Sequence, residues 1–319
     1  MLGINLGSLP LVAYQFLKPQ PARQIPAMRE MMGLSISQDH APTHVIQELV
    51  EELGVKNILI RVPSWQVGSP QYDSLLRFIE KFKEYELIIN ILQSPFSCND
   101  VDLWQKQVTQ IFSDLNETCS TYQIGNAVNR SKWGCRHTAD VIKLFEAAHL
   151  ARKQFDNIKL AGSSIIDFEP LLTLRTLLNG AQYKFDICAS QLYINRRGSA
   201  FGKQYGYFDL EKKIRLIAAM LRLSNNTQNR LWITETNWPL LNTKPYTPNS
   251  GHPRSTVDEA TQAEYLIQYF EVARKTGLVE KVFWWQLINP GYGLIDHRQG
   301  DLRKMPSFHA FKSLLKNSD

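Results

Sequence analysis

Cysteine is scarce in this sequence and forms no recognisable pattern. The four cysteines are widely scattered, without a CxxC pair, at Cys98, Cys119, Cys135 and Cys188. A chain of 319 residues buries a sufficient core without disulfides, so we expect free thiols. No His or Cys spacing is typical of a structural zinc site. His40 and His44 have Pro42 between them, which indicates ordinary histidines at a helix start.

Long apolar runs are absent as well. The best candidate, Leu9 to Leu17, is interrupted by Gln15 and is too short to span a bilayer. The chain begins MLGINLGSLP, without a basic segment before an apolar run, so we predict no secretory signal. From these two absences we expect a cytoplasmic protein without a transmembrane segment.

A large excess of one charge sign is also missing. The 36 Lys and Arg residues against 30 Asp and Glu residues give a net charge of +6 and a pI near 9.0. This balance fits an anionic substrate, but no basic helix or RNP-like motif indicates nucleic acid as a partner. The 44% apolar and 21% charged residues are typical of a globular protein and exclude collagen, coiled coils and disorder.

Short apolar, β-rich runs alternate with amphipathic runs of helical period from Met31 onward. The predicted strands are 31–37, 57–63, 86–93, 121–126, 158–165, 185–194, 230–236 and 281–288. The predicted helices are 42–53, 70–83, 100–115, 138–155, 170–178, 209–223, 258–276 and 306–316. Helix-start chemistry supports several of them, with Pro42, Pro70 and Pro170 near first turns and Asp100, Asp209 and Asp258 as caps.

Apolar strands that are each followed by a helix imply a parallel sheet covered by helices. Eight such units in about 285 residues match the count and length of a closed (β/α)8 TIM barrel. A doubly wound open sheet is the competing fold, but no GxGxxG follows an early strand and no P-loop occurs. We therefore predict an N-terminal extension over residues 1–30 and a single barrel domain over 31–319.

The active site of such a barrel lies at the carboxyl ends of its strands. Five of the seven tryptophans fall at or just beyond predicted strand ends: Trp65, Trp133, Trp238, Trp284 and Trp285. Flat aromatic faces beside Asn, Gln, Tyr and Arg suit a sugar ring, although any single Trp could instead cap the barrel. By strand alternation, Trp232 and Trp284 point outward into the helix layer.

Glu235 closes an apolar strand, where a carboxylate has to be solvated, paired or functional. Arg61 and Tyr193 also belong to the predicted barrel mouth and are suited to hold it ionised; a structural ion pair with Arg61 is the alternative. An ionised Glu among aromatic residues is how a retaining glycosidase holds its nucleophile.

Several segments together resemble the glycoside hydrolase clan A barrels. They are Arg61, YQIGNAVN at 122–129, QLY at 191–193, WITETNWP at 232–239 and FWWQLINPGYGL at 283–294. The resemblance implies that Glu235 is the nucleophile, positioned by Arg61 and hydrogen-bonded by Tyr193. It further implies that Asn126 binds the sugar 2-hydroxyl and that Trp285 is the sugar platform. QIGNAVNRSKWG and TETNWPL are similar to a bacterial glycosidase-like subgroup associated with lipopolysaccharide gene clusters, which implies a surface glycan as substrate.

The sequence departs from that family at its acid/base position. The family motif is Asn-Glu-Pro, whereas this chain has Asn126, Ala127 and Val128. A methyl group cannot protonate a leaving oxygen, and such help is worth ~10²–10⁴ in rate. An engineered Glu→Ala change would have left the proline in place, so we interpret the absence as natural.

Three hypotheses remain for the function. The first is a retaining glycosidase or transglycosidase with a replacement acid, which Asp167, Glu169, His40 or the substrate would supply. The second is a transfer enzyme whose anionic donor needs no protonation, for which the basic loop residues are Arg130, Lys132, Arg136, Arg196, Arg197 and Lys203. The third is a barrel that binds carbohydrate without catalysis.

A carbohydrate substrate, whether neutral or anionic, is the partner in all three hypotheses, and displacement between carboxylates needs no metal or cofactor. The candidate substrate-binding residues are Arg61, Asn126, Asn129, Arg130, Trp133, Tyr193, Asn237, Trp238 and Trp285. The sequence specifies neither the sugar nor the oligomeric state.

Overall fold

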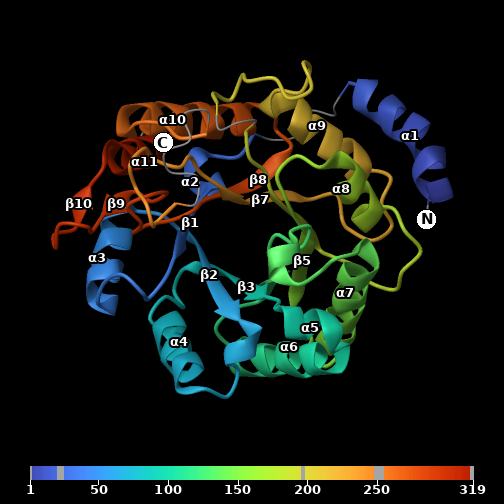
Figure 1. The fold of residues 1–319 in the computed structure, drawn as a ribbon, viewed down its shortest axis with the longest axis horizontal. Coiled ribbons are helices and arrows are strands. Elements are labelled where there is room, and N and C mark those ends of the chain that lie inside the picture. Colours follow the sequence, from blue (N-terminus) through green and yellow to red (C-terminus); the bar gives the residue numbers. More distant parts are fainter. Residues whose placement is uncertain (1, 20–24, 195–197, 248–254, 317–319) are drawn as a thin grey trace. The chain divides into compact units, whose positions relative to one another are not determined.

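The computed structural model describes residues 2–19, 25–194, 198–247 and 255–316. Within them a closed barrel is formed by β1 (Met32–Ile36), β2 (Asn57–Pro63), β3 (Glu86–Leu92), β4 (Thr121–Ile124), β5 (Lys159–Ile166), β6 (Ile187–Gln191), β7 (Leu231–Thr236) and β8 (Val279–Trp284) (Figure 1). The strands follow one another around the barrel in chain order, and β1 pairs in parallel with β8. The predicted (β/α)8 fold is confirmed, and the open sheet is excluded because the two end strands pair.

The barrel strands are buried on both faces, as their near-continuous apolar runs predict. Every residue of β1, β4, β6 and β7 is buried. Ile91 of β3 pairs with Ile124 of β4, so the two strands end side by side. Each predicted strand overlaps an observed one, and β2 has the predicted bounds.

Helices follow the strands along the chain. They are α3 (Thr43–Leu53), α4 (Pro70–Glu80), α6 (Val101–Leu115), α7 (Thr138–Arg152), α8 (Pro170–Leu177), α9 (Leu210–Leu221), α10 (Glu259–Lys275) and α11 (Pro306–Lys316). The predicted caps Asp100, Asp209 and Asp258 each accept a hydrogen bond from the backbone N–H three residues further on. Each of these bonds satisfies one of the first N–H groups of its helix, which lack an intrahelical partner. Among the described residues, none of the helices combines the length and apolar character needed to cross a bilayer.

Other elements were not predicted. They are α1 (Leu2–Leu17), α2 (Met28–Met31), α5 (Pro95–Asn99), the short 3₁₀ helices η1 (Ser64–Gln66) and η2 (Ser131–Trp133), and the antiparallel pair β9 (Ile295–Asp296) and β10 (Arg303–Lys304). The prediction missed α1 because Pro10 lies inside it. Arg222 fixes this helix by donating to the Gln15 carbonyl oxygen at 2.7 Å.

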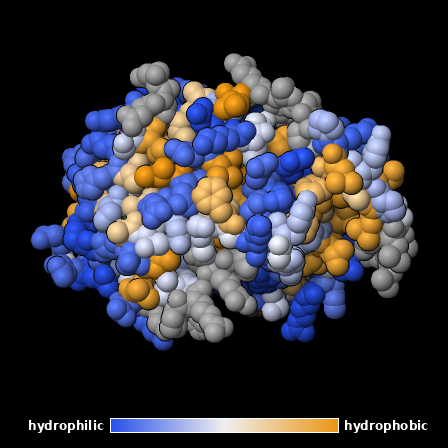
Figure 2. Space-filling model, turned by 90° about the horizontal axis from the view of Figure 1, so that it is seen from above, coloured by the Kyte–Doolittle hydropathy of each residue, from blue (hydrophilic) through white to orange (hydrophobic). Residues whose placement is uncertain are grey.

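The chain folds into two compact units. The first unit comprises Met1–Pro21, Ile60–Gln191 and Arg215–Trp232, and the second comprises Ala22–Leu59, Leu192–Ile214 and Ile233–Asp319. Aromatic side chains fill the core of each unit, and one face of the molecule shows mostly hydrophilic residues with hydrophobic ones among them (Figure 2).

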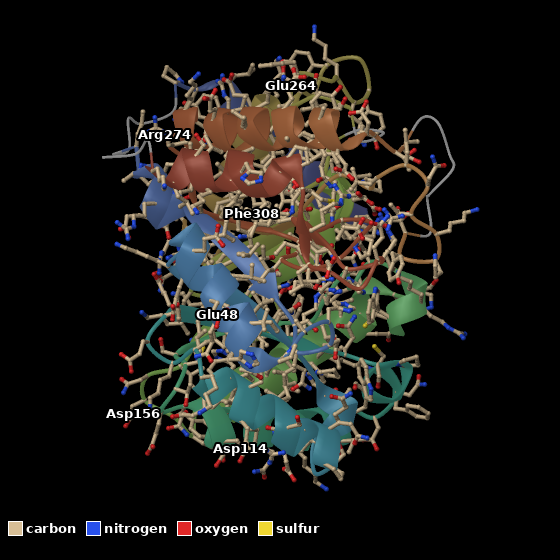
Figure 3. The ribbon with its side chains drawn as sticks, turned by 90° about the vertical axis from the view of Figure 1, so that its left-hand side faces the viewer. Glu48, Asp114, Asp156, Glu264, Arg274 and Phe308 are labelled. Atoms are coloured by element: carbon tan, nitrogen blue, oxygen red, sulfur yellow. The ribbon has the colours of Figure 1, made fainter. Side chains whose placement is uncertain are left out.

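In the second unit, α10 and α11 lie side by side, with Phe308 on α11 and Glu264 and Arg274 on α10 (Figure 3). The Phe270 and Phe311 rings meet edge to face between these helices, with their centroids 5.8 Å apart. Such aromatic pairs bury large apolar areas and stabilise the helix layer.

Candidate active site

Glu235 is a buried carboxylate at the end of β7, in the second unit. Its side chain is 7% exposed, and Tyr193, which is 4% exposed, donates its hydroxyl hydrogen to Glu235 Oε1. The predicted pairing of Tyr193 with Glu235 is therefore present in the structure. A buried carboxylate needs such donors, because each unsatisfied oxygen would carry an uncompensated desolvation penalty.

The backbone that carries Tyr193 is held by two buried side chains of the same unit. Lys213 of α9 is completely buried, and its Nζ donates to the Tyr193 carbonyl oxygen at 3.1 Å. The Tyr269 hydroxyl of α10 donates to the Leu192 carbonyl oxygen at 2.6 Å. These bonds fix the chain on which the partner of Glu235 is mounted, and a fully buried lysine is otherwise rare.

Asn237 and Trp285 meet after β7 and β8, as expected from their strand-end positions. The Asn237 side-chain amide donates to the Trp285 carbonyl oxygen at 3.1 Å, and the Trp285 N–H donates to the Thr236 carbonyl oxygen at 3.1 Å. The Trp285–Gln286 peptide bond is cis, and the Trp285 side chain is half-buried. Asn237 Oδ1 is buried without a hydrogen-bond partner among the described residues.

Trp238 differs from the expectation of a sugar platform. It is completely buried, its indole N–H donates to the Gly198 carbonyl oxygen at 3.0 Å, and its ring stacks on Trp284 at 6.0 Å. A ring enclosed on all sides offers no face to a ligand, so in this structure Trp238 is a core residue. Trp232 and Trp284 are buried too, which fits the outward positions predicted for them.

In the first unit, Asn126 is held just after β4 by other polar side chains. Asn126 Oδ1 accepts from Gln191 Nε2 at 2.7 Å and from Arg61 Nη2 at 3.3 Å. Gln93 fixes the Asn126 backbone, accepting from its N–H at 2.8 Å and donating to its carbonyl oxygen at 2.9 Å. Because both contacts on the amide oxygen come from donors, the Asn126 NH₂ group is left to donate elsewhere.

Ala127 occupies a tightly constrained turn. Its φ is +45°, in the left-handed region that non-glycine residues rarely adopt, and it is 2% exposed. Its N–H donates to Gln191 Oε1 at 2.6 Å, so Gln191 contacts both Asn126 and Ala127.

Asn129 and Arg130 are occupied by contacts within the first unit. The Asn129 amide bridges the backbone N–H and carbonyl oxygen of Ile166, both at 2.9 Å. Arg130 donates from Nη2 to Asp167 at 2.6 Å and from Nη1 to Glu169. These contacts tie the β4–α7 loop to the end of β5, so the structure gives both residues a role in loop anchoring.

The candidate replacement acids have partners of their own. Asp167 and Glu169 both accept from Arg130, and the guanidinium favours the charged form of a carboxylate over the form that donates a proton. In the second unit, His40 stacks on His297 with ring centroids 4.9 Å apart. Burial, together with His297, lowers the pKa of His40 and so favours its neutral form.

The remaining aromatic and basic candidates lie in the loops. Trp65 is exposed in η1, whereas Trp133 in η2 is half-buried with the Lys132 ammonium 5.4 Å from its ring centroid. Lys132, Arg136 and Lys203 are exposed. Arg196 and Arg197 lie outside the described residues.

No metal cluster was predicted. Within the part of the chain that the structure describes, no group of three or more His, Cys, Asp or Glu side chains is arranged to hold a metal ion.

The sequence analysis missed two supporting residues. Gln191 is the last residue of β6, two positions before Tyr193. A polar amide at the end of a buried strand could have indicated a role at the barrel mouth. Lys213 carried no signal, because its spacing within α9 does not distinguish a buried lysine from an exposed one.

Similarity to other proteins was found at the level of structure alone. No protein-family model matches the sequence, and no curated protein matches it. A family 39 glycoside hydrolase from Bacteroides cellulosilyticus WH2 has a similar structure, with a TM-score of 0.65 and 13% identity over 93% of this chain and 66% of that one. The family 1 β-glucosidase from Thermotoga maritima also has a TM-score of 0.65 and 13% identity, with an alignment that covers 93% of this chain and 99% of that one.

A third similar structure is a GH2 β-galacturonidase from Eisenbergiella tayi, with a TM-score of 0.60 and 12% identity. The alignment covers 93% of this chain and 51% of that protein, so this chain spans about half the length of the larger enzyme. At these identities the likeness shows a shared barrel fold.

Proposed function

We propose that this chain is a carbohydrate-active enzyme that uses Glu235 as the nucleophile of a retaining reaction. The observation that carries the proposal is the buried Glu235 carboxylate at a strand end, hydrogen-bonded by the Tyr193 hydroxyl. A carboxylate in that environment is desolvated but ordered, which suits attack on an anomeric carbon. The glycoside hydrolases that share the fold support the same chemistry.

The reaction has two displacements. In the first, a Glu235 oxygen forms a bond to the anomeric carbon while the bond to the leaving oxygen breaks, and its electron pair stays on that oxygen. In the second, water or an acceptor hydroxyl attacks the same carbon and releases the carboxylate, and the proton of the attacking hydroxyl passes to a base. The sugar thereby keeps its anomeric configuration.

Two further residues support a sugar ligand. The Asn126 amide is fixed through its oxygen, which leaves its NH₂ group available, and the family resemblance implies that this residue binds the sugar 2-hydroxyl. Trp285 is half-buried and anchored through its backbone, as a stacking platform would be.

Ala127 favours a second candidate within the same mechanism. Neither Ala127 nor the Arg130-bound carboxylates offer a proton to a leaving oxygen. A glycosyl phosphate or nucleotide sugar has a leaving group that departs as a stable anion. The first displacement with such a donor therefore needs no acid from the protein.

The test uses 2-fluoro glycosyl fluorides and dinitrophenyl 2-fluoroglycosides of several sugars, whose leaving groups depart without acid assistance. We expect intact mass spectrometry to show one covalent sugar on the protein, and peptide mapping to place it on Glu235. The 2-fluoro group slows the second displacement, so the adduct accumulates.

The matched control is Glu235→Gln, which keeps size and hydrogen bonding but removes the nucleophilic charge. It should bind the same sugars in calorimetry and form no adduct. Adduct formation on this variant at the wild-type rate would reject Glu235 as nucleophile. Sugar binding without any adduct across the panel would instead establish a non-catalytic carbohydrate-binding barrel.

A further inference from the structure

A pocket of about 200 Å³ lies in the first unit, between the β4–α7 loop and α8. Val128, Ile165 and Leu172 are among its apolar lining residues, and Arg136, His137 and Arg175 supply basic groups. None of the residues that line it is acidic. The nearby Asp140 accepts a hydrogen bond from the His137 N–H at 3.1 Å and is therefore occupied at the start of α7.

Arg175 is a lining residue of this pocket whose guanidinium group lacks a hydrogen-bond partner among the described residues. It lies in the last turn of α8, and its Nε is buried without a hydrogen-bond partner among the described residues. A buried guanidinium N–H without an acceptor is costly, since it has lost water and gained nothing in return. The Nε atom itself is enclosed, but the rest of the half-buried guanidinium makes no hydrogen bond or ion pair among the described residues, and the pocket lining offers it no acidic side chain.

The start of α7 adds favourable electrostatics to the same pocket. His137 and Thr138 line it, and Thr138 is the first residue of this 15-residue helix. The N-terminal end of a helix carries partial positive charge and N–H groups that favour anions. Arg136, exposed at the pocket rim, extends the positive charge toward solvent.

We propose that this pocket binds a small anionic group, a carboxylate or a phosphate monoester, through Arg175 and the start of α7. A pocket of about 200 Å³ accommodates such an anionic substituent. The assignment of a glycan ligand to this pocket rests on the proposed function, whose substrate would then carry an acidic group. Val128 and Asn129, which line the pocket, directly follow Asn126 and Ala127 in the chain.

The experiment is calorimetric binding to the full chain of four probes: methyl glucuronide, glucose 6-phosphate, inorganic phosphate and methyl glucoside. We expect at least one charged probe to bind more tightly than methyl glucoside. Arg175→Gln should weaken that charged probe by about ten- to a hundred-fold and leave methyl glucoside unchanged, as a charge-assisted hydrogen bond is lost. The preferred charged probe distinguishes a carboxylate from a phosphate ligand.

Arg77→Gln is the matched control, since Arg77 is an exposed arginine of α4 outside the pocket. It makes the same change in net charge and should leave all four affinities unchanged. Arg136→Gln is the second pocket variant, and it is the decisive one if Arg175→Gln fails to fold by circular dichroism.

Equal affinity of the wild-type protein for charged and neutral probes would overturn the proposal. A loss of affinity for the charged probe in Arg77→Gln as large as that in Arg175→Gln would overturn it as well. Arg175-dependent anion binding without an adduct on Glu235 would support the pocket and reject the enzyme. An adduct on Glu235, together with anion affinities that do not depend on Arg175, would support the enzyme and reject the anion pocket.

Discussion

The Glu235 side chain lies where almost no solvent reaches it, and the Tyr193 hydroxyl donates a hydrogen bond to its Oε1. A hydrogen bond to an ionised group contributes more than one between neutral groups, and removing it leaves the carboxylate oxygen unsatisfied. In the proposed reaction this contact would also hold the attacking carboxylate in one orientation.

Tyr193→Phe should slow covalent labelling of Glu235 by about ten- to a hundred-fold, because the carboxylate loses the donor that orients it. The rate is measured by intact mass spectrometry with the best 2-fluoro glycosyl fluoride. Tyr14→Phe, at an exposed tyrosine of α1, is the control and should label at the wild-type rate. Equal rates for Tyr193→Phe and wild type would show that the contact does not act on the nucleophile.

The cysteines should differ in reactivity. Cys98 and Cys135 Sγ lie 2.7 Å apart, and the hydrogen bond from Cys135 lowers the pKa of Cys98 against the opposing effect of burial. Burial raises the pKa of Cys119 to about 11 and that of Cys188 to about 12.

Because the thiolate is the reactive form, iodoacetamide at pH 8 should alkylate Cys98 first, and Cys98→Ser should abolish the fast phase. Peptide mapping over time measures the order. Early modification of either Cys119 or Cys188 in the folded protein would contradict it.

At the scale of elements, α9 acts through one buried side chain. Lys213 Nζ donates to the Tyr193 carbonyl oxygen, and its removal would leave that oxygen without this donor. Neighbouring Lys212 is 29% exposed and pairs with Asp209 three residues away, so the two lysines form a natural comparison on one helix.

Lys213→Met should lower the free energy of unfolding by about 1–3 kcal/mol, since a buried charged hydrogen bond is lost. Lys212→Met should cost less than about 1 kcal/mol, as expected for a solvent-screened pair. Urea unfolding measures both. A smaller loss for Lys213→Met than for Lys212→Met would refute a supporting role of Lys213.

The short β9–β10 pair contains Asp296, a carboxyl group whose surroundings favour its ionised form. Burial of Asp296 opposes its charge, but hydrogen bonds from Arg298 and Arg303 outweigh burial and hold its pKa well below the usual range. A carboxyl with a depressed folded-state pKa stabilises the fold above its unfolded pKa of about 3.9, and that stabilisation disappears as the pH falls toward the folded value.

Asp296→Asn should therefore lower stability at pH 7 by about 1–2 kcal/mol, and the difference from wild type should shrink between pH 5 and pH 2. Urea midpoints of the two proteins across this range test the sign. A difference that grows as the pH falls would contradict the assignment.

At the scale of the whole molecule, a net charge of +6 favours the approach of anions. If the substrate is acidic, raising the ionic strength from 0.01 to 0.15 M should slow adduct formation with charged fluorides several-fold, because the Debye length shortens from ~30 to ~8 Å. Neutral fluorides should be unaffected. Stopped-flow or quenched labelling at subsaturating donor measures the rates, and equal salt dependence for both classes would contradict electrostatic steering.

Much of the barrel could be predicted because its signals are local. Strands such as β2 are short apolar runs bounded by breakers, and Asp100 and Asp258 cap the helices that follow them in the sequence. The two-residue strands β9 and β10 are too short to show any periodicity, which is why they were missed. Helix α1 was missed because Pro10 lies inside it, and proline normally indicates that a helix ends.

The strand-end positions of the candidate residues and the Tyr193–Glu235 contact could be predicted from the sequence, whereas most other contacts could not. Glu235, Asn126 and Trp285 follow from strand ends, and the sequence alone determines that Ala127 cannot act as an acid. The partner of each side chain depends on segments far away in the chain, as Lys213 lies 20 residues from Tyr193 and Gln191 lies 65 from Asn126.

The sequence by itself determined the number and order of the barrel strands, the carboxylate at the end of β7 and the missing carboxylate after β4, because these depend on residue type and local periodicity. Only the tertiary structure decided that Trp238 is enclosed in the core and that Asn129 and Arg130 anchor a loop. It also decided that Arg175 lines a pocket with no acidic side chain among its lining residues. Burial and partner choice are properties of packing, and packing brings together residues whose relation no local pattern records.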